Sequence, residues 1–344
     1  MLNLAVIGLG KWGQRHAQSA SASGRFKVVK GVDTASVPMD FPVVPSIDEV
    51  LDDPDIDAIS IATPHTLHAE QIRLAAEAGK HILTEKPFAL SYANAQQNVK
   101  VTGDNNVVLA LGHDHRFYPS IAAMKKLIAD EALGQITTVQ SVLSHDFTKA
   151  AIEKLNKAVA GDKGSRDDGT WWRLNLAEAP VGPMVHLGIH HLDLFIHLFG
   201  EIDWVLASSP VRTIDTPFPD TMLVTLGFVS GKIGTINSSL ASPLNSRLLI
   251  SGSEGWAEAI GPDDIASYTL SSLNSVKSRI GSAQPELTQF ALVDSVAANF
   301  AAFADAIEGI APYPVAAADM LHNAAALEAI VKSSQSSDIV KVGR

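Results

Sequence analysis

Short apolar runs alternate with longer helical patterns through the first third of the chain. The runs show no regular polar alternation, which is typical of parallel strands that are buried on both faces. We expect such strands at residues 4–7, 26–32, 58–62, 81–83 and 107–111. The segments between them predict helices, for example 66–78, which ends at Gly79. Strand–helix alternation with short connections predicts an α/β Rossmann domain, a doubly wound parallel sheet, over residues 1–120.

The pattern changes after about residue 130. Strand-like runs then follow one another without intervening helices, at 135–144, 203–212, 221–228, 232–239 and 247–251. Such a succession predicts an α+β domain with an open, mostly antiparallel sheet over residues 121–344. Residues 149–175 indicate a helix followed by a mobile, glycine-rich loop. Two helical segments, 297–308 and 316–333, close the chain, and we expect them to pack back near the first domain.

Composition narrows the class of protein. The 344 residues are 46% hydrophobic and 18% charged, which suits two buried cores and excludes a disordered chain. The net charge of −11 without a basic tract argues against a nucleic-acid partner, and 0 Cys excludes disulfides and thiolate metal sites. No apolar run reaches the roughly 18 residues of a membrane helix, and the N-terminus lacks the basic start of a signal peptide. We therefore expect a cytoplasmic protein with no membrane partner.

Residues 8–13 read Gly-Leu-Gly-Lys-Trp-Gly, a GxGxxG pattern directly after the first expected strand and at the start of a helical segment. In such a loop the first glycine permits a tight turn and the second lets the backbone approach a pyrophosphate. The third lets the helix pack closely on its strand. The helix N-terminus supplies free N–H groups and the positive end of the helix dipole. We expect a dinucleotide to contact Gly8, Gly10, Lys11, Trp12 and Gly13.

Asp33 lies twenty residues after Gly13, at the end of the second expected strand. A carboxylate at this place can bind both ribose hydroxyls of an adenosine, and it would repel a 2′-phosphate. Residues 34–36, Thr-Ala-Ser, contain no arginine that could pair with that phosphate. The pattern predicts NAD as the cofactor in preference to NADP. A glycine-rich turn in which Asp33 merely caps a strand is the structural alternative.

Glu85, Lys86 and Pro87 follow the fourth expected strand. Ligands of doubly wound sheets bind at the carboxyl ends of the strands, so Lys86 is expected near the nicotinamide. Its ammonium can hydrogen-bond a substrate hydroxyl and stabilise a developing alkoxide. We also expect a cis peptide bond before Pro87. A surface ion pair at the strand end is the alternative interpretation.

Three further motifs accompany these: Ala-Thr-Pro-His-Thr-Leu-His at 62–68, Gly-His-Asp-His-Arg-Phe at 112–117 and Gly-Ile-His-His-Leu-Asp at 188–193. Together with the glycine loop and the Glu-Lys-Pro turn, they resemble the glucose–fructose oxidoreductase/inositol dehydrogenase/rhizopine-catabolism (Gfo/Idh/MocA) family over nearly the whole chain. The resemblance implies NAD(P)-dependent hydride transfer on sugars, polyols or sugar-derived alcohols. It also implies an open sheet used for oligomerisation, in a homodimer or homotetramer.

Four titratable residues, His186, His190, Asp193 and His197, are spaced to share one face of a helix. By resemblance, His190 matches the family's catalytic histidine, the proton acceptor from the hydroxyl being oxidised. His186 stands where the family usually has Asp, and we expect it to share proton handling, so that the catalytic set is Lys86, His190 and His186. His186, His190 and Asp193 could instead hold zinc or iron. Hydride transfer to a nicotinamide needs no metal, however, and we predict none.

Further contacts follow from the resemblance, from strand ends and, for Trp172 and Arg173, from the end of the glycine-rich loop, where aromatic residues suit stacking on the C–H faces of a sugar. For the cofactor they are Thr63, Pro64, His65, His68, Glu85 and Lys86. For the substrate they are Asp114, Arg116, Trp172, Arg173, His186 and His190. Arg116 could equally be a structural link, and Trp172 could anchor a lid or a subunit contact.

The sequence thus predicts an NAD-dependent oxidoreductase that acts on the CH–OH group of a sugar, polyol or sugar-derived alcohol. Two alternatives stay open. One is an NAD-using lyase or glycosidase that oxidises its substrate only transiently and releases no net NADH. The other is a non-catalytic NAD-binding regulator.

Overall fold

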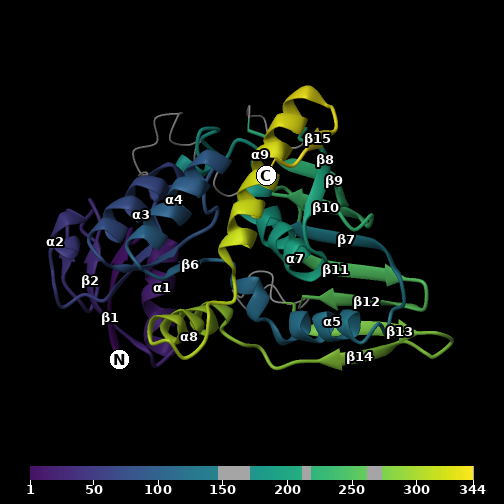
Figure 1. Cartoon of the computed structure of the whole chain (residues 1–344), viewed down its shortest axis with the longest axis horizontal. Coiled ribbons are helices and arrows are strands. Elements are labelled where there is room, and N and C mark those ends of the chain that lie inside the picture. The colour runs from purple at the N-terminus through teal and green to yellow at the C-terminus, as the bar shows by residue number, and fades with distance from the viewer. Residues whose placement is uncertain (146–170, 211–217, 262–272, 344) are drawn as a thin grey trace. The chain divides into compact units, whose positions relative to one another are not determined.

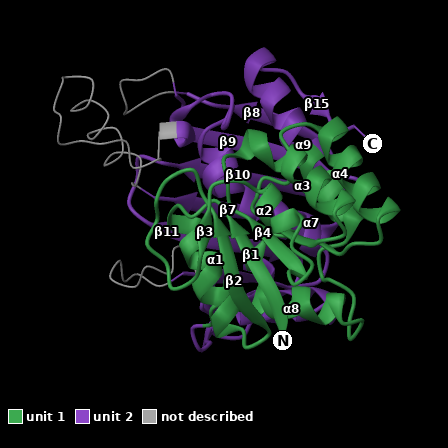
Figure 2. Ribbon diagram, turned by 90° about the vertical axis from the view of Figure 1, so that its left-hand side faces the viewer, with its two compact units in different colours: residues 1–114, 293–324 green, residues 115–292, 325–344 purple. Residues whose placement is uncertain are grey.

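The computed structural model describes residues 1–145, 171–210, 218–261 and 273–343, and it divides into two compact units (Figure 2). The first unit comprises residues 1–114 and 293–324, and the second comprises 115–292 and 325–344. The expected boundary at residue 120 falls inside helix α5 (Pro119–Ala129). The division comes earlier because Arg116 already pairs with Asp193 of the second unit. Most of the expected helix and loop at 149–175 lies outside the described residues.

The first unit is built on a six-stranded parallel sheet with the strand order β3-β2-β1-β4-β5-β6. Its strands are β1 (Leu2–Ile7), β2 (Phe26–Val32), β3 (Val43–Val44), β4 (Ala58–Ile61), β5 (His81–Thr84) and β6 (Leu109–Leu111). The order reverses between β1 and β4, which is the arrangement of a dinucleotide-binding sheet. The predicted Rossmann domain is confirmed, with β3 as a strand that the sequence analysis did not predict.

Helices cover both faces of this sheet (Figure 1). They are α1 (Lys11–Ala22), α2 (Asp48–Leu51), the 3₁₀ turn η1 (His65–Leu67), α3 (His68–Glu77), α4 (Tyr92–Asp104), α8 (Ser295–Ile307) and the first part of α9 (Ala317–Ser336). On one face, α1 and α8 enclose a core in which the Phe26 ring stacks on Phe303 at 5.6 Å between centroids. On the other face, α3 and α4 bury Ile72 and Ala95 against the strands. Chain from beyond residue 290 is therefore part of the cofactor-binding fold.

The second unit contains a nine-stranded sheet with the order β14-β13-β12-β11-β7-β10-β9-β8-β15. Its strands are β7 (Ile136–Ser144), β8 (Ile202–Ser208), β9 (Thr221–Phe228), β10 (Ile233–Ser239), β11 (Asn245–Gly252), β12 (Gly255–Ile260), β13 (Ser275–Ile280), β14 (Glu286–Gln289) and β15 (Val340–Lys341). The pair β7–β10 is parallel and the other paired strands are antiparallel. The predicted mostly antiparallel sheet is confirmed, and the last four strands extend it beyond the five that were expected.

One face of the second sheet is packed and the other is open. Helix α5 lies on β12 and β13, and a π-helical turn, η4 (Met184–Gly188), lies on β10 and β7. Helix α7 (Ile189–Phe199) follows directly and places Phe195 against Phe228. Several alternate residues of β8, β9 and β10 are exposed or half-buried, and Leu206, Leu223 and Ile233 are among the exposed ones. Two further 3₁₀ turns, η2 (Asp114–Phe117) and η3 (Trp171–Leu174), carry residues of the candidate site.

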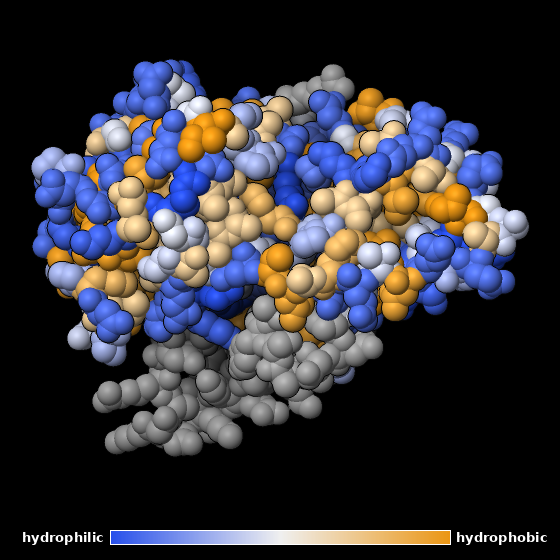
Figure 3. Space-filling view, turned by 90° about the horizontal axis from the view of Figure 1, so that it is seen from below, coloured by the Kyte–Doolittle hydropathy of each residue, from blue (hydrophilic) through white to orange (hydrophobic). Residues whose placement is uncertain are grey.

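Apolar and polar residues are interspersed on the face of the molecule that Figure 3 displays. Larger exposed apolar side chains occur in both units, for example Leu67 and Leu223. Among the described residues, none of the helices has both the length and the apolar character that a membrane crossing requires.

Candidate functional site

The glycine loop after β1 is tightly packed at one end and open in the middle. Gly8 has φ +84°, which a side chain would strain. A Cβ atom on Gly13 would lie 1.7 Å from the Gly8 carbonyl oxygen, whereas a Cβ on Gly10 would meet no atom within 4 Å. The first turn of α1 carries no acidic residue that could compete for its N–H groups. The loop therefore fits the pyrophosphate of a dinucleotide at the helix N-terminus.

Asp33 lies directly after β2 and beside this loop. Its Oδ2 accepts a hydrogen bond of 2.7 Å from the backbone N–H of Leu9, and its Oδ1 accepts one of 2.8 Å from that of Ala35. The carboxylate is thereby held next to the loop, partly buried. A carboxylate at this strand end suits the ribose hydroxyls of a dinucleotide.

The Glu-Lys-Pro turn follows β5 and is held by hydrogen bonds. The Lys86–Pro87 peptide bond is cis, as the sequence analysis predicted. Glu85 Oε2 accepts from the backbone N–H of Lys86 at 3.2 Å, and Oε1 lies 2.8 Å from His16 Nε2. Lys86 is buried, with 8% of its surface exposed. Burial acts to raise the pKa of Glu85, but the His16 hydrogen bond and the charges of His16, Lys86 and His68 outweigh it. The pKa of Glu85 is therefore below its ordinary value.

His68 also contacts the Glu-Lys-Pro turn, at the backbone carbonyl of Pro87. It is fully buried, and its two ring nitrogens each lie 3.1 Å from a backbone carbonyl oxygen, those of Pro87 and Thr63. His65, in η1 after Pro64, is also buried and meets the His68 ring edge-on, with centroids 5.7 Å apart. Of the expected cofactor residues at 63–68, His68 thus contacts the turn that carries Lys86, and Thr63 and His65 contact His68.

Asp114, at the end of the first unit, has an unusual protonation equilibrium. Its Oδ2 accepts a 2.5 Å hydrogen bond from Ser295 Oγ, a partner that the sequence analysis did not identify. Burial, aided by the negative charge of Glu85, raises the pKa of Asp114 to about 6, against the opposing effects of Ser295, Lys86 and His113. This carboxyl group therefore changes charge near neutral pH.

The Asp114→Asn protein should lack a pH-dependent part of the wild-type stability. Because the folded-state pKa of Asp114 is above its ordinary value, folding takes up a proton. The wild-type free energy of unfolding therefore falls as the pH rises from about 4 through about 6. A pKa difference of about two units corresponds to about 3 kcal/mol. Because Asp114 is partly exposed to solvent, which weakens the effect, we expect the wild type to lose about 2 kcal/mol of unfolding free energy over this window relative to Asp114→Asn. Urea unfolding at a series of pH values measures the difference, and a difference that is constant with pH would contradict the assignment.

In the second unit, a buried ion pair joins η2 to α7. Arg116 Nε donates to Asp193 Oδ2 at 2.7 Å, and its Nη2 donates to Oδ1 at 2.6 Å. The two side chains are 2% and 1% exposed. Arg116 Nη1 also lies 3.3 Å from His197 Nδ1. Both carboxylate oxygens of Asp193 are thus engaged by the guanidinium, in the geometry of a structural clamp.

A stacked pair of imidazoles lies beside this clamp. The rings of His115 and His190 are 4.1 Å apart between centroids and 15° from parallel, and both residues are buried. Their neighbour His191 is fully buried, and burial together with the positive charge of His115 lowers its pKa to about 3. His190 therefore lies in a group of imidazoles that cannot all be protonated at neutral pH. His115 was not among the predicted site residues, although it belongs to the motif at 112–117 that drew attention to Asp114 and Arg116.

His186 departs from the predicted helical face. Residues 184–188 form a π-helical turn, wider than an α-helical one, so the expectation of one regular helix through His186 and His197 is wrong there. His190, Asp193 and His197 contact η2, whereas His186 Nε2 lies 2.7 Å from the carbonyl oxygen of Arg173 in η3. The structure thus groups His186 with Arg173.

The Arg173 side chain covers an aromatic ring. Its guanidinium carbon lies 4.4 Å from the centroid of the half-buried Trp172, a cation–π contact.

The candidate residues of the site are divided between the two units. The set in the first unit comprises the glycine loop with Lys11 and Trp12, Asp33, residues 63–65, His68, Glu85, Lys86 and Asp114. The set in the second unit comprises Arg116, Trp172, Arg173, His186 and His190.

Comparisons with known proteins agree with both parts of the fold. Residues 2–113 match the oxidoreductase family with an NAD-binding Rossmann fold, and residues 121–258 match the Gfo/Idh/MocA C-terminal domain. Levoglucosan dehydrogenase of Pseudarthrobacter phenanthrenivorans is 30% identical over 185 residues, which are 54% of this chain and 44% of that protein. Inositol 2-dehydrogenase of Rhizobium meliloti is 25% identical over 271 residues, 75% of each chain. The chain spans about half the length of the first curated relatives that it matches.

Among solved structures, levoglucosan dehydrogenase in complex with NADH matches with a TM-score of 0.84 at 21% identity. The match covers 100% of this chain and 99% of that chain. At this identity the likeness shows the fold. The family matches to the two domains together cover most of the chain, and the protein therefore belongs to the Gfo/Idh/MocA family of oxidoreductases.

Proposed function

We propose that the protein is an NAD-dependent dehydrogenase that oxidises a CH–OH group of a sugar, polyol or sugar-derived alcohol. The observation that carries the proposal is the buried Lys86, in the same unit as a loop that fits a dinucleotide. The Glu85 carboxylate accepts from the backbone N–H of Lys86, and the charges of the two side chains interact. A buried ammonium is costly unless it is paired, and such groups are concentrated at sites of chemistry. The names of the curated relatives, levoglucosan dehydrogenase and inositol 2-dehydrogenase, support the substrate class.

In the proposed reaction, Lys86 hydrogen-bonds the substrate hydroxyl and stabilises the alkoxide that develops as the hydride leaves. His190 takes the hydroxyl proton, a role that suits an imidazole because its ordinary pKa is near neutral pH. When bound, NAD⁺ supplies the acceptor for the hydride. Any proton transfer by His186 would go through Nδ1, since its Nε2 faces the carbonyl oxygen of Arg173. Unchanged turnover in a His190→Ala protein would rule out its role as the base.

A panel of sugar alcohols, aldoses and inositols, assayed with NAD⁺ by nicotinamide absorbance, tests the function. We expect net NADH formation with at least one compound, and none with a Lys86→Ala control. Substrate conversion without net NADH, detected by product analysis, would favour a lyase or glycosidase with transient oxidation. NAD binding with no conversion of any compound would favour a non-catalytic regulator.

The cofactor preference rests on Asp33, and its replacement should weaken that preference. Loss of the carboxylate removes hydrogen bonds to the ribose hydroxyls and the repulsion of a 2′-phosphate. Because a charged hydrogen bond is worth about 1.5–3 kcal/mol, the ratio of kcat/KM for NAD over NADP should fall at least ~10-fold in Asp33→Ala. Steady-state kinetics with both cofactors measure this ratio. Asp40→Ala, which removes an exposed carboxylate from the segment after β2, should leave it unchanged. An unchanged ratio in Asp33→Ala would contradict the assignment.

A further inference from the structure

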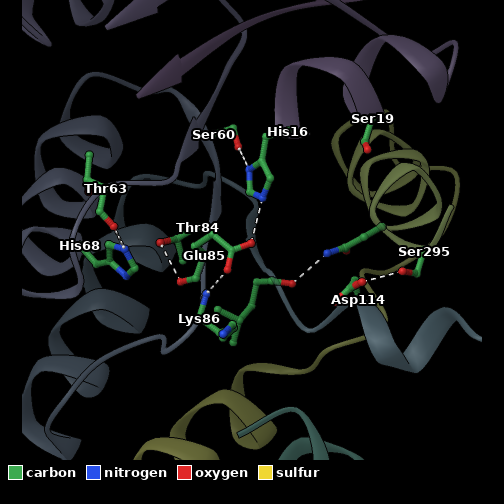
Figure 4. Close-up of polar contacts among 12 residues, drawn as sticks. His16, Ser19, Ser60, Thr63, His68, Thr84, Glu85, Lys86, Asp114 and Ser295 are labelled. Carbon is green, nitrogen blue, oxygen red and sulfur yellow. Dashed lines mark hydrogen bonds and ion pairs between the residues drawn. The ribbon is translucent and has the colours of Figure 1, made fainter. Parts of the chain in front are cut away.

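His16 lies between two polar side chains in the interior of the first unit (Figure 4). It projects from α1, and its Nδ1 lies 2.7 Å from Ser60 Oγ on β4. Its Nε2 lies 2.8 Å from Glu85 Oε1, after β5. Ser60 is 0% exposed and His16 is 1% exposed. Three elements that are distant in the sequence are thus joined through one imidazole.

The direction of the hydrogen bonds follows from the charge on Glu85. The pKa of Glu85 is below its ordinary value, so the group is a carboxylate that can only accept. His16 must therefore donate from Nε2, which leaves Nδ1 for the contact with the Ser60 hydroxyl. Glu85 Oε2 accepts from the Lys86 backbone N–H. Both oxygens of the carboxylate are consequently fixed, one by α1 and one by the turn that carries Lys86.

The surroundings of the His16–Glu85 contact are closely packed. A Cβ atom on Gly112 would lie 2.8 Å from Glu85 Oε1, so only glycine at this position gives the carboxylate enough space. The His16 ring meets Phe300 edge-on at 5.5 Å and Trp12 at 6.4 Å between centroids. With so little of its surface exposed, His16 cannot reach a substrate, and any role in the reaction must act through Glu85.

We propose that His16 is a positioning residue that couples the phosphate-binding helix to Lys86 through the Glu85 carboxylate. Helix α1 begins at the glycine loop, so dinucleotide phosphates bound at its N-terminus would fix the same helix that holds Glu85. The inference rests on the proposed function, because Lys86 is the group through which His16 affects turnover. The other charged groups that act on Glu85 are Lys86 and His68, and Glu85 in turn acts on Asp114.

Two amide substitutions separate the two hydrogen bonds of His16. In His16→Gln the side-chain amide can take the place of Nε2 and donate to Glu85, whereas in His16→Asn it reaches only the place of Nδ1, near Ser60. We expect His16→Asn to lower kcat by about 10- to 100-fold, with the KM for NAD within about threefold of the wild type. His16→Gln should keep kcat within about threefold. Equal losses in the two variants, or no loss in His16→Asn, would overturn the proposal.

A second measurement needs no substrate. The fixed Glu85 carboxylate favours the charged form of Lys86, which does not react with an acylating reagent. We therefore expect acetic anhydride to label Lys86 at least about threefold faster in His16→Asn than in the wild type, as followed by peptide mass spectrometry at pH 8. His16→Gln should label at the wild-type rate. Equal labelling rates in all three proteins would overturn the proposal.

The Gly112→Ala substitution should displace the Glu85 carboxylate without altering His16. Its Cβ would push on the Glu85 carboxylate, so it should reproduce the faster labelling and the lower kcat of His16→Asn. Wild-type labelling and turnover in a folded Gly112→Ala protein would count against the coupling. If the wild type oxidises no compound of the panel, the proposed function fails. The labelling rates then still decide whether His16 positions Lys86.

Discussion

The Lys86→Met protein should lose about 10²–10³-fold in kcat and keep its affinity for NAD within about threefold of the wild type. Methionine has nearly the same length as lysine but supplies neither the charge nor the hydrogen bond. Removing one group that stabilises a developing oxyanion costs about 10²–10³-fold in kcat, and stabilising the alkoxide is the role proposed for Lys86. The affinity for NAD should persist, because the glycine loop and Asp33 that bind it are unchanged.

Steady-state turnover and calorimetric titration with NAD measure the two quantities separately. Lys100→Met is a matched control, since this lysine is on α4, exposed, and within the described part of the chain forms an ion pair with Asp104 of the same helix. It should keep wild-type kcat. If Lys86→Met retained more than about a tenth of the wild-type turnover, the lysine would not stabilise the developing alkoxide as proposed.

Much of the first unit could be predicted from local patterns. The run at 26–32 forms β2 with the predicted bounds. The run at 58–62 forms β4, whose four residues are all buried, because a strand within a parallel sheet is covered on both faces and shows no polar alternation. The two-residue β3, Val43–Val44, is too short to show any period. Of the late strands, β14 is exposed along its whole length and shows no buried face from which a pattern could be recognised.

The candidate site likewise has a part that could be predicted from the sequence and a part that could not. Gly8, Asp33 and Lys86 could be identified because their roles depend on spacing from a strand end. The long-range hydrogen bonds of the site could not be identified, because each joins distant parts of the chain. Ser60 and Glu85 are 44 and 69 residues from His16, and Ser295 is 181 residues from Asp114. Nothing in a local pattern indicates such pairs, which exist only after the sheet has formed.

The clearest error of the sequence-based prediction concerns the π-helical turn before α7. The spacing of His186, His190 and Asp193 predicts one helical face, and regular α-helical geometry would have produced it. The turn at Met184–Gly188 instead directs His186 to the carbonyl oxygen of Arg173. Gly188 lies at the end of this turn, and a Cβ there would lie 2.4 Å from Ser238 Oγ. The π-helical turn is thus closely packed on β10.

The buried ion pair between Arg116 and Asp193 should have the largest effect on stability. Asp193→Asn and Arg116→Met each leave one partner of a bidentate, almost fully buried pair without its counter-charge. Each should lower the free energy of unfolding by about 3–5 kcal/mol. The double variant Arg116→Met/Asp193→Leu should lose much less than the sum, because a buried pair can be replaced by apolar side chains at little cost. Urea unfolding measures all three. Arg247→Met, which breaks a partly exposed pair with Glu258, should cost only about 0–1 kcal/mol.

The same double variant decides what Arg116 does. The sequence left two roles open, a substrate contact or a structural link, and the structure places its guanidinium on Asp193. If the link is the whole role, the double variant should recover both stability and substrate KM, because η2 again packs on α7 and keeps His115 stacked on His190. If Arg116 also binds substrate, stability should return while KM stays raised, by about 10-fold or more for a lost charged hydrogen bond. Losses of stability that simply add in the double variant would show that the two side chains are not coupled at all.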